Sequence, residues 1–274
     1  MSNVAWIIIA FIIYAGVMVG IGAAFFRKSE NLTDFFLGGR KLNAWVAALS
    51  AQASDMSGWL LMGLPGAVYA LGTGQMWIAV GLAAGTALNW IFVAKRLRRH
   101  TIAANNAITL PEFFENRFGD DSKLLRTVSA AFIIIFFAVY TASAFVSSGT
   151  LFSQVFGMDY QAALLVGVLV ILVYTFLGGF AAVCWTDLVQ GLLMLVAILA
   201  VPICALADIG GADAARATLS PAFLDPFGDG AGGAQTPVSV VSQLAWGLGY
   251  FGMPHILVRF MAIKSDETVK RSAT

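Results

Sequence analysis

Long apolar runs are the feature that most limits what this chain of 274 residues can fold into. Each of seven runs has roughly the 20 residues that an α-helix needs to cross the hydrocarbon core of a bilayer. Only 11% of the residues are charged, against about 25% in a soluble domain. We therefore expect one all-α, multi-pass membrane domain over residues 1–274. The predicted spans are Val4–Phe26, Leu42–Leu71, Gln75–Ala94, Leu124–Leu151, Gln161–Leu177, Leu188–Ala207 and Val238–Ala262.

The basic residues give these spans an orientation. If the chain crosses the membrane at each run, all sixteen Lys and Arg residues except Arg216 lie on one side. That side is cytoplasmic by the positive-inside rule, so we expect an outside N-terminus and a cytoplasmic chain end. Arg27 and Lys28 follow the first run, whereas a cleaved signal peptide has its positive charges in front. The first run is therefore predicted to be a permanent span.

Two connections carry local signals. Thr109 and Glu112 have the spacing of a capping box, with Pro111 in the first turn, so a short helix is predicted in the long cytoplasmic loop. Residues 178–187 separate two predicted spans and are predicted to form a short loop.

Asp55 lies near the middle of the second run. A carboxylate at the centre of a membrane helix costs about 2.5–3.5 kcal/mol on insertion scales, and such residues usually mark an ion or substrate pathway. Its neighbours Ser54, Ser57 and Gly58 are poor helix formers. This pattern predicts a coordination site, the alternative being a charge at a helix end that reaches water.

Two of the spans are predicted to be irregular. Leu42–Leu71, as one helix of about 30 residues, would be ~45 Å long, more than the ~30 Å core, so it is tilted or broken. Val238–Ala262 contains three glycines and a proline within 246–254, which disfavours a continuous helix. Close packing against another helix is the alternative explanation of these glycines. Interrupted spans at matching places in two oppositely oriented halves are typical of the binding site of a secondary transporter.

Other classes of protein have little support in the sequence. Cys184 and Cys204 lie in apolar surroundings and give no disulfide or metal framework, and two histidines, His100 and His255, are too far apart to indicate a metal site. No second carboxylate accompanies Asp55 at membrane depth to indicate an enzyme. We expect no enzyme, no cofactor and no nucleic-acid partner.

Several longer motifs resemble the sodium/solute symporter family. They are Leu37-Gly38-Gly39-Arg40, the stretch Ser54–Gly66, Tyr174–Gly179 with Trp185-Thr186-Asp187, and Trp246–Gly252 with Pro254-His255. The resemblance runs from about Asn31 to the end of the chain. It implies a fold with about thirteen spans in two inverted five-helix repeats, with discontinuous helices. By that measure the chain holds the first span, the whole first repeat and the opening span of the second, so we expect the N-terminal part of a symporter.

The resemblance also implies a function. The nearest members of the family import proline with sodium into bacteria across the inner membrane, so sodium, proline and the lipid bilayer are the expected partners. Pantothenate or another organic solute is the alternative substrate, and a symporter-like sensor domain of a signalling protein is the alternative class.

Residue roles follow from the same resemblance. For sodium it implies Asp55 with the backbone carbonyls of Ala53 and Met56. The residues that it implies for the solute are Ser57, Trp59, Tyr140, Trp246, Tyr250 and Pro254. Those that it implies for gating or the route of the ion are Arg40, Ser50, Gly63 and Asp187. Without the resemblance, the aromatic residues could equally belong to a membrane-interface belt, and Asp187 could cap a helix.

The orientation can be tested with single cysteines at Ala103 and Ala231, after Cys184 and Cys204 are replaced by serine. An impermeant thiol reagent added to intact cells should label position 231 and not position 103, because the basic loop is predicted to be cytoplasmic. Labelling of position 103 but not 231 would reverse the orientation.

Overall fold

The computed structural model describes residues 3–26 and 31–274, and helices make up most of that part of the chain. The α-helices are α1 (Asn3–Phe26), α2 (Leu32–Leu37), α3 (Ala44–Asp55), α4 (Leu64–Leu71), α5 (Met76–Leu88), α6 (Lys95–Ala103), α7 (Leu110–Phe118), α8 (Leu124–Phe156), α9 (Tyr160–Ile209), α10 (Ala212–Thr218), α11 (Pro221–Leu224), α12 (Pro237–Leu244), α13 (Pro254–Met261) and α14 (Asp266–Ala273). Between them lie the 3-10 segments η1 (Gly38–Arg40), η3 (Thr73–Gln75) and η5 (Ala245–Gly252) and the π-helical segments η2 (Trp59–Gly63) and η4 (Asn89–Ala94).

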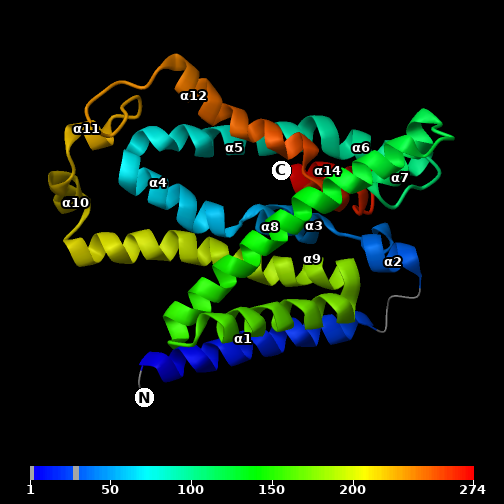
Figure 1. The fold of residues 1–274 in the computed structure, drawn as a ribbon, viewed down its shortest axis with the longest axis horizontal. Helices are drawn as coiled ribbons and strands as arrows, with labels where there is room; N and C mark the ends of the chain where they lie inside the picture. The colour runs from blue at the N-terminus through cyan, green and yellow to red at the C-terminus, as the bar shows by residue number, and fades with distance from the viewer. Residues whose placement is uncertain (1–2, 27–30) are drawn as a thin grey trace.

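Long apolar helices confirm the predicted membrane fold. Among the described residues, four helices are long and apolar enough to cross a membrane: Ala5–Phe26, Thr73–Ala103, Leu124–Phe156 and Gly178–Ile209. A shorter apolar helix covers Tyr160–Val173. The two remaining predicted spans are interrupted. Figure 1 shows the long helices running between two ends of the molecule, with α2, α6 and α7 at one end and the α4–α5 turn, α10 and α11 at the other.

Both spans that were predicted to be irregular are broken. The second stops being α-helical at Asp55, where Met56 has φ −68° and ψ 84°, and resumes as a π-helical turn before α4. The last runs from α12 through eight residues of 3-10 helix to α13. Unwound backbone at membrane depth needs polar partners, and the buried Asn89 side chain supplies one by donating to the carbonyl oxygen of Tyr250 at 2.9 Å.

Glycine packing accompanies the break in the last span. A Cβ atom added at Gly247 would lie 2.0 Å from the carbonyl oxygen of Gly81, and one added at Gly85 would lie 2.2 Å from that of Gly247. The backbones of α5 and η5 therefore touch directly. Added Cβ atoms at Gly249 and Gly252 meet nothing within 4 Å. Close packing explains Gly247, and it occurs together with the unwound backbone.

The predicted loop at 178–187 is wrong. The chain reverses at a single residue, Gly179, whose φ of 59° and ψ of −160° are open only to glycine, and helix resumes directly after it. The two arms of α9 lie side by side, joined by this reversal (Figure 1). Any other residue at 179 would also collide with the carbonyl oxygen of Phe35, 2.9 Å from the added Cβ.

Other connections also carry more helix than predicted. The basic stretch after Ala94 continues the preceding span as α6, which follows η4 directly, rather than forming a loop. The connection after α9 contains α10 and α11 and folds back on the α4–α5 turn, where the indole nitrogen of Trp77 donates to the carbonyl oxygen of Pro226 at 2.8 Å. At α7 the predicted cap forms on one side: the Thr109 hydroxyl accepts from the amide of Glu112, while the Glu112 carboxylate accepts from Ile108 rather than Thr109.

Arginine side chains close the basic end of the molecule. Arg98 donates to the carbonyl oxygens of Ile263 and Lys264, both at 2.7 Å, and to the Asp266 carboxylate at 2.9 Å. Burial raises the pKa of Asp266, but the guanidinium groups of Arg99 and Arg98 outweigh it and hold that pKa below its ordinary value. These contacts fix the end of α13 against α6.

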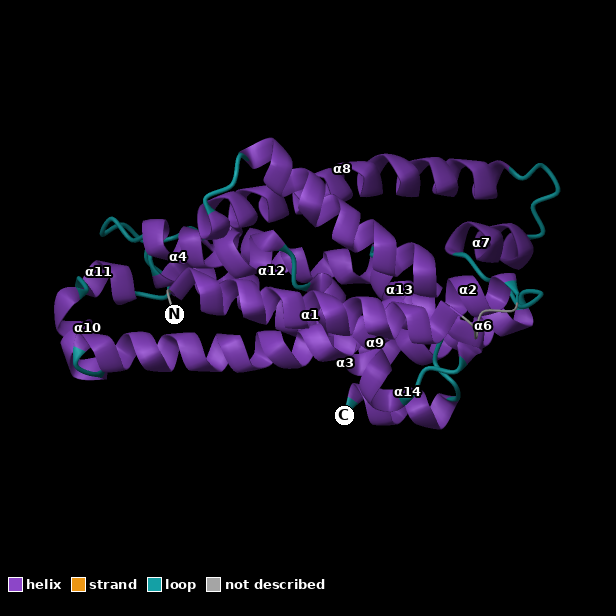
Figure 2. Cartoon of the chain, turned by 90° about the horizontal axis from the view of Figure 1, so that it is seen from below, coloured by secondary structure: helices purple, strands orange, loops and turns teal. Residues whose placement is uncertain are grey.

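On another face, α8 lies along the outside of the bundle (Figure 2) and packs mainly on α9 and α7.

Candidate functional site

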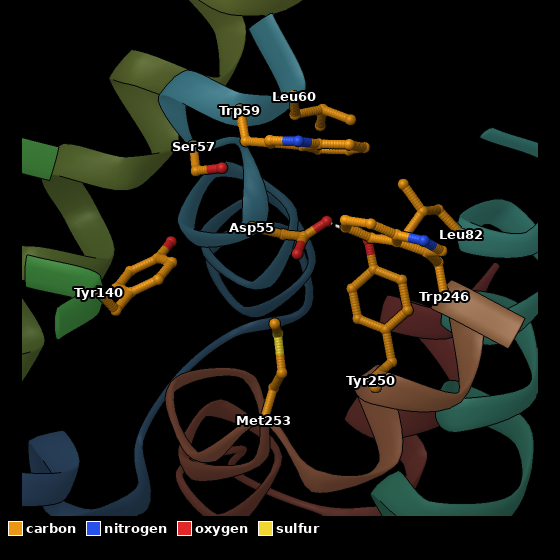
Figure 3. Close-up of a pocket in the computed structure, with 10 residues that line it drawn as sticks. Asp55, Ser57, Trp59, Leu60, Leu82, Tyr140, Trp246, Tyr250 and Met253 are labelled. Carbon is orange, nitrogen blue, oxygen red and sulfur yellow. Dashed lines mark hydrogen bonds between the residues drawn. The ribbon is translucent and has the colours of Figure 1, made fainter. Parts of the chain in front are cut away.

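A cavity of about 210 Å³ lies between the two broken spans and α8. Figure 3 shows its walls. The residues that line it are Asp55, Ser57, Trp59, Leu60, Leu82, Tyr140, Trp246, Gly249, Tyr250 and Met253. Six of these are residues that the sequence predicted for sodium or solute, and they come from three separate stretches of the chain.

Asp55 reaches the cavity because α3 ends there. The amide of Ser57 donates to the carbonyl oxygen of Asp55 at 2.8 Å, whereas a continuous helix would direct it to Ala53. This tight turn leaves the Asp55 side chain at the open end of the helix. Its carboxylate accepts a hydrogen bond from the hydroxyl of Tyr250, whose side chain is buried on η5. The contact joins the two broken spans across the cavity (Figure 3).

Two indoles cover the cavity beside this contact. The rings of Trp59 and Trp246 stack with their centroids 4.5 Å apart and their planes at 16°, a geometry that stabilises by about 0.5–1.5 kcal/mol beyond burial. Gly63 lies behind the first ring: a Cβ added there would come within 2.9 Å of it. Gly63 therefore leaves room for the position of Trp59 without lining the cavity itself.

Asp55 has no cationic partner in the described part of the chain. The five ion pairs found there all involve other carboxylates. A carboxylate at membrane depth without a cation is costly, and this one faces a cavity. The environment therefore suits a small cation that enters from outside the protein.

The negative charge of Asp187, by contrast, has a cationic partner and two hydroxyl donors. It is 8% exposed on α9, and its Oδ2 accepts from the Arg259 guanidinium at 2.9 Å, from the Ser50 hydroxyl at 2.6 Å and from the Ser54 hydroxyl at 3.2 Å. Ser50 in turn accepts from Arg259 Nε at 2.8 Å. Because Asp187 lies inside α9, the alternative that it caps a helix is wrong. The expectation that no second carboxylate lies at membrane depth is also wrong, since Asp187 belongs to the apolar helix Gly178–Ile209.

The remaining predicted residues lie at varying distances from the cavity. Ala53 is buried on the last turn of α3, and Met56 forms the break after it. Pro254 is the first residue of α13, directly after the lining residue Met253. Arg40 is far from the cavity lining: it donates to the carbonyl oxygens of Met261 and Ala107 at the basic end of the molecule.

Arg259 is the important residue that sequence reasoning misplaced. It was grouped with the basic residues at the cytoplasmic end, yet it is 5% exposed inside α13. It lies within the predicted span Val238–Ala262, so the argument about intramembrane charge that singled out Asp55 could have found it. His255 was given no role at the site, yet it packs on Phe137 and on the cavity residue Tyr140. The apolar wall residues Leu60, Leu82 and Met253 carry no sequence signal of their own.

Discontinuous membrane helices that meet around an uncompensated carboxylate are the arrangement of a secondary transporter. A family model, that of the sodium:solute symporter family, matches residues 35–274. The chain belongs to this family. The fold is similar to a solved structure described as the substrate-bound outward-open state of a Na+-coupled sialic acid symporter, with a TM-score of 0.76 and 22% identity, over 95% of this chain and 54% of that one.

Curated relatives with much higher identity are proline transporters. The high-affinity proline transporter PutP of Bacillus subtilis (strain 168) is 49% identical over 93% of this chain and 54% of its own length. The sodium/proline symporter of Haemophilus influenzae is 47% identical over 96% of this chain and 52% of its own, and that of Escherichia coli (strain K12) is 46% identical over the same shares. The chain thus spans about half the length of the curated relatives it matches.

The buried ion pair between Arg259 and Asp187 leads to a prediction about the stability of the protein. Arg259→Ala should destabilise the protein by about 3–5 kcal/mol, because removal of one partner leaves Asp187 charged and buried alone. Replacing both partners, as in Arg259→Met with Asp187→Leu, should recover most of that loss. Arg271→Ala, which breaks the exposed pair with Glu267, is the matched control and should change little. Thermal unfolding in detergent would measure this, and equal losses for Arg259→Ala and Arg271→Ala would contradict it.

Proposed function

We propose that the protein containing these residues imports proline together with sodium, and that it transports rather than catalyses. The observation that carries this proposal is the Asp55 carboxylate, which faces a cavity between two broken spans without a cationic partner among the described residues. The proline transporters among the relatives support the choice of solute.

In this proposal sodium binds at the break after α3. Asp55 supplies the negative charge, and the carbonyl oxygens of Ala53 and Met56, on either side of it, supply neutral ligands. Sodium prefers several oxygen ligands, and peptide carbonyls freed from a helix offer them without adding charge. The Tyr250 hydroxyl, which donates to Asp55, ties the ion site to the solute side of the cavity.

The solute occupies the aromatic part of the cavity. Trp59, Trp246, Tyr250 and Tyr140 line it, and their aromatic rings suit the apolar body of a pyrrolidine ring. Ser57 offers a hydroxyl, and Pro254 begins α13, whose amino end favours a carboxylate. Pantothenate is a longer and more polar molecule, for which this mostly apolar lining is less suited. The alternative of a sensor domain has no observation here in its favour.

Gating is assigned to residues outside the cavity. Ser50 and Asp187 form the buried cluster with Arg259 on the route away from Asp55, Gly63 leaves space for the Trp59 ring, and Arg40 holds the basic end together. We place the protein in the bacterial inner membrane, with this basic end in the cytoplasm and the N-terminus outside.

The ion site can be tested by Asp55→Asn in the protein expressed from its complete reading frame. The change keeps the size of the side chain and removes the charge. Loss of one partner of a buried charge pair costs about 2–5 kcal/mol, so the sodium concentration for half-maximal proline uptake should rise about 30-fold or more. Asp213→Asn, on the outer helix α10, is the control. Sodium titration of radiolabelled proline uptake in proteoliposomes measures both, and an unchanged titration in Asp55→Asn would refute the ion site.

A further inference from the structure

His255 is half-buried, and both of its ring nitrogens are buried without a hydrogen-bond partner in the described part of the chain. It is the second residue of α13, directly after Pro254. Buried side-chain nitrogens are nearly always paired, and leaving them unpaired disfavours the folded state. The imidazole is therefore held in place by something other than hydrogen bonds.

Ring contacts are what hold it. The imidazole stacks on Tyr140 with centroids 5.6 Å apart and planes at 22°, and it meets Phe137 edge-on at 5.4 Å. Phe137 and Tyr140 themselves touch at 5.6 Å, so the three rings form one cluster. Two of them belong to α8, which packs mainly on α9 and α7. His255 is thus a link from α13 to a helix whose main contacts lie elsewhere.

The cluster borders the cavity through Tyr140. One face of this ring stacks on His255, while the side chain lines the cavity together with Asp55 and Met253 (Figure 3). The Tyr140 hydroxyl is tied to the carbonyl oxygen of Ser54 by a long contact of 3.5 Å. Such a contact is weak. The position of the Tyr140 side chain therefore depends mainly on its ring contacts.

We propose that His255 is a positioning residue for the solute: it holds the Tyr140 ring against the cavity by stacking, and its nitrogens take no part. This inference rests on the function proposed above, since it concerns how the wall of the proline site is kept in place. His255 does not line the cavity, so its influence on the solute passes through Tyr140. A flat ring at 255 is sufficient for that influence.

Three substitutions separate the ring from its nitrogens. His255→Phe keeps a flat ring and removes the nitrogens, His255→Asn keeps a polar end and removes the ring, and Tyr140→Ala removes the partner. The half-saturating proline concentration at saturating sodium should change less than about twofold in His255→Phe. In His255→Asn and in Tyr140→Ala it should rise about 3- to 10-fold, the range of a lost aromatic contact, with the maximal rate much less affected.

The double variant tests whether the two residues act as one. His255→Asn combined with Tyr140→Ala should be no worse than Tyr140→Ala alone, because residues that act through one contact are not additive. Additive effects would overturn the proposal. So would a normal proline response in His255→Asn with a weakened one in His255→Phe, which would mean that the nitrogens act on the solute.

A second measurement does not depend on the solute. In thermal unfolding of the purified protein, His255→Phe should be at least as stable as the wild type, because two unpaired buried nitrogens are removed, and the 140–255 pair should again be non-additive. A less stable His255→Phe, or additive losses of stability in the 140–255 pair, would refute the stacking role even if the protein transports another solute. Absence of sodium-dependent proline uptake in the wild type would instead refute the proposed function alone.

Discussion

The hydrogen bond between the Tyr250 hydroxyl and the Asp55 carboxylate is the interaction on which the site depends. Each residue lies on a span that is broken at membrane depth, where unwound backbone survives only if protein or a cavity satisfies it. The breaks place Asp55 at the end of α3 and Tyr250 on η5, and the cavity lies between them. Buried polar support from Asn89 and the direct contact of Gly247 with Gly81 keep η5 against α5.

The carboxylates of Asp55 and Asp187 have different electrostatic roles. Asp187 is neutralised by Arg259 and by two serine hydroxyls, whereas Asp55 has a tyrosine but no cation among the described residues. A charge inside the membrane is stable only with a partner. In the function proposed above, this difference is the reason why the cation binds at Asp55. Through its hydrogen bonds to Ser50 and Asp187, Arg259 connects α13 to α3 and α9.

Much of the fold, and part of the candidate site, could be predicted from the sequence. Apolar runs predicted the spans, and the residues around Asp55 and the glycines with Pro254 predicted the two breaks, because composition and local propensity decide these features. The sharp reversal at Gly179 could not be predicted, since the pair Gly178-Gly179 does not reveal which residue has a positive φ or that helix resumes directly after it. The ring cluster around His255 and the pairing of Arg259 with Asp187 depend on which helices become neighbours, which only the tertiary fold determines.

The central claim is that cation and solute share one cavity bounded by Asp55 and Tyr250. Binding of proline to the purified protein, measured by titration calorimetry in sodium and in choline buffer, tests it most directly. Ligands that meet in one site must change each other's affinity by the same factor. The account predicts much tighter proline binding in sodium, and a smaller gain in Tyr250→Phe, which lacks the hydroxyl that joins the two sides. Equal proline affinity in sodium and in choline would contradict it.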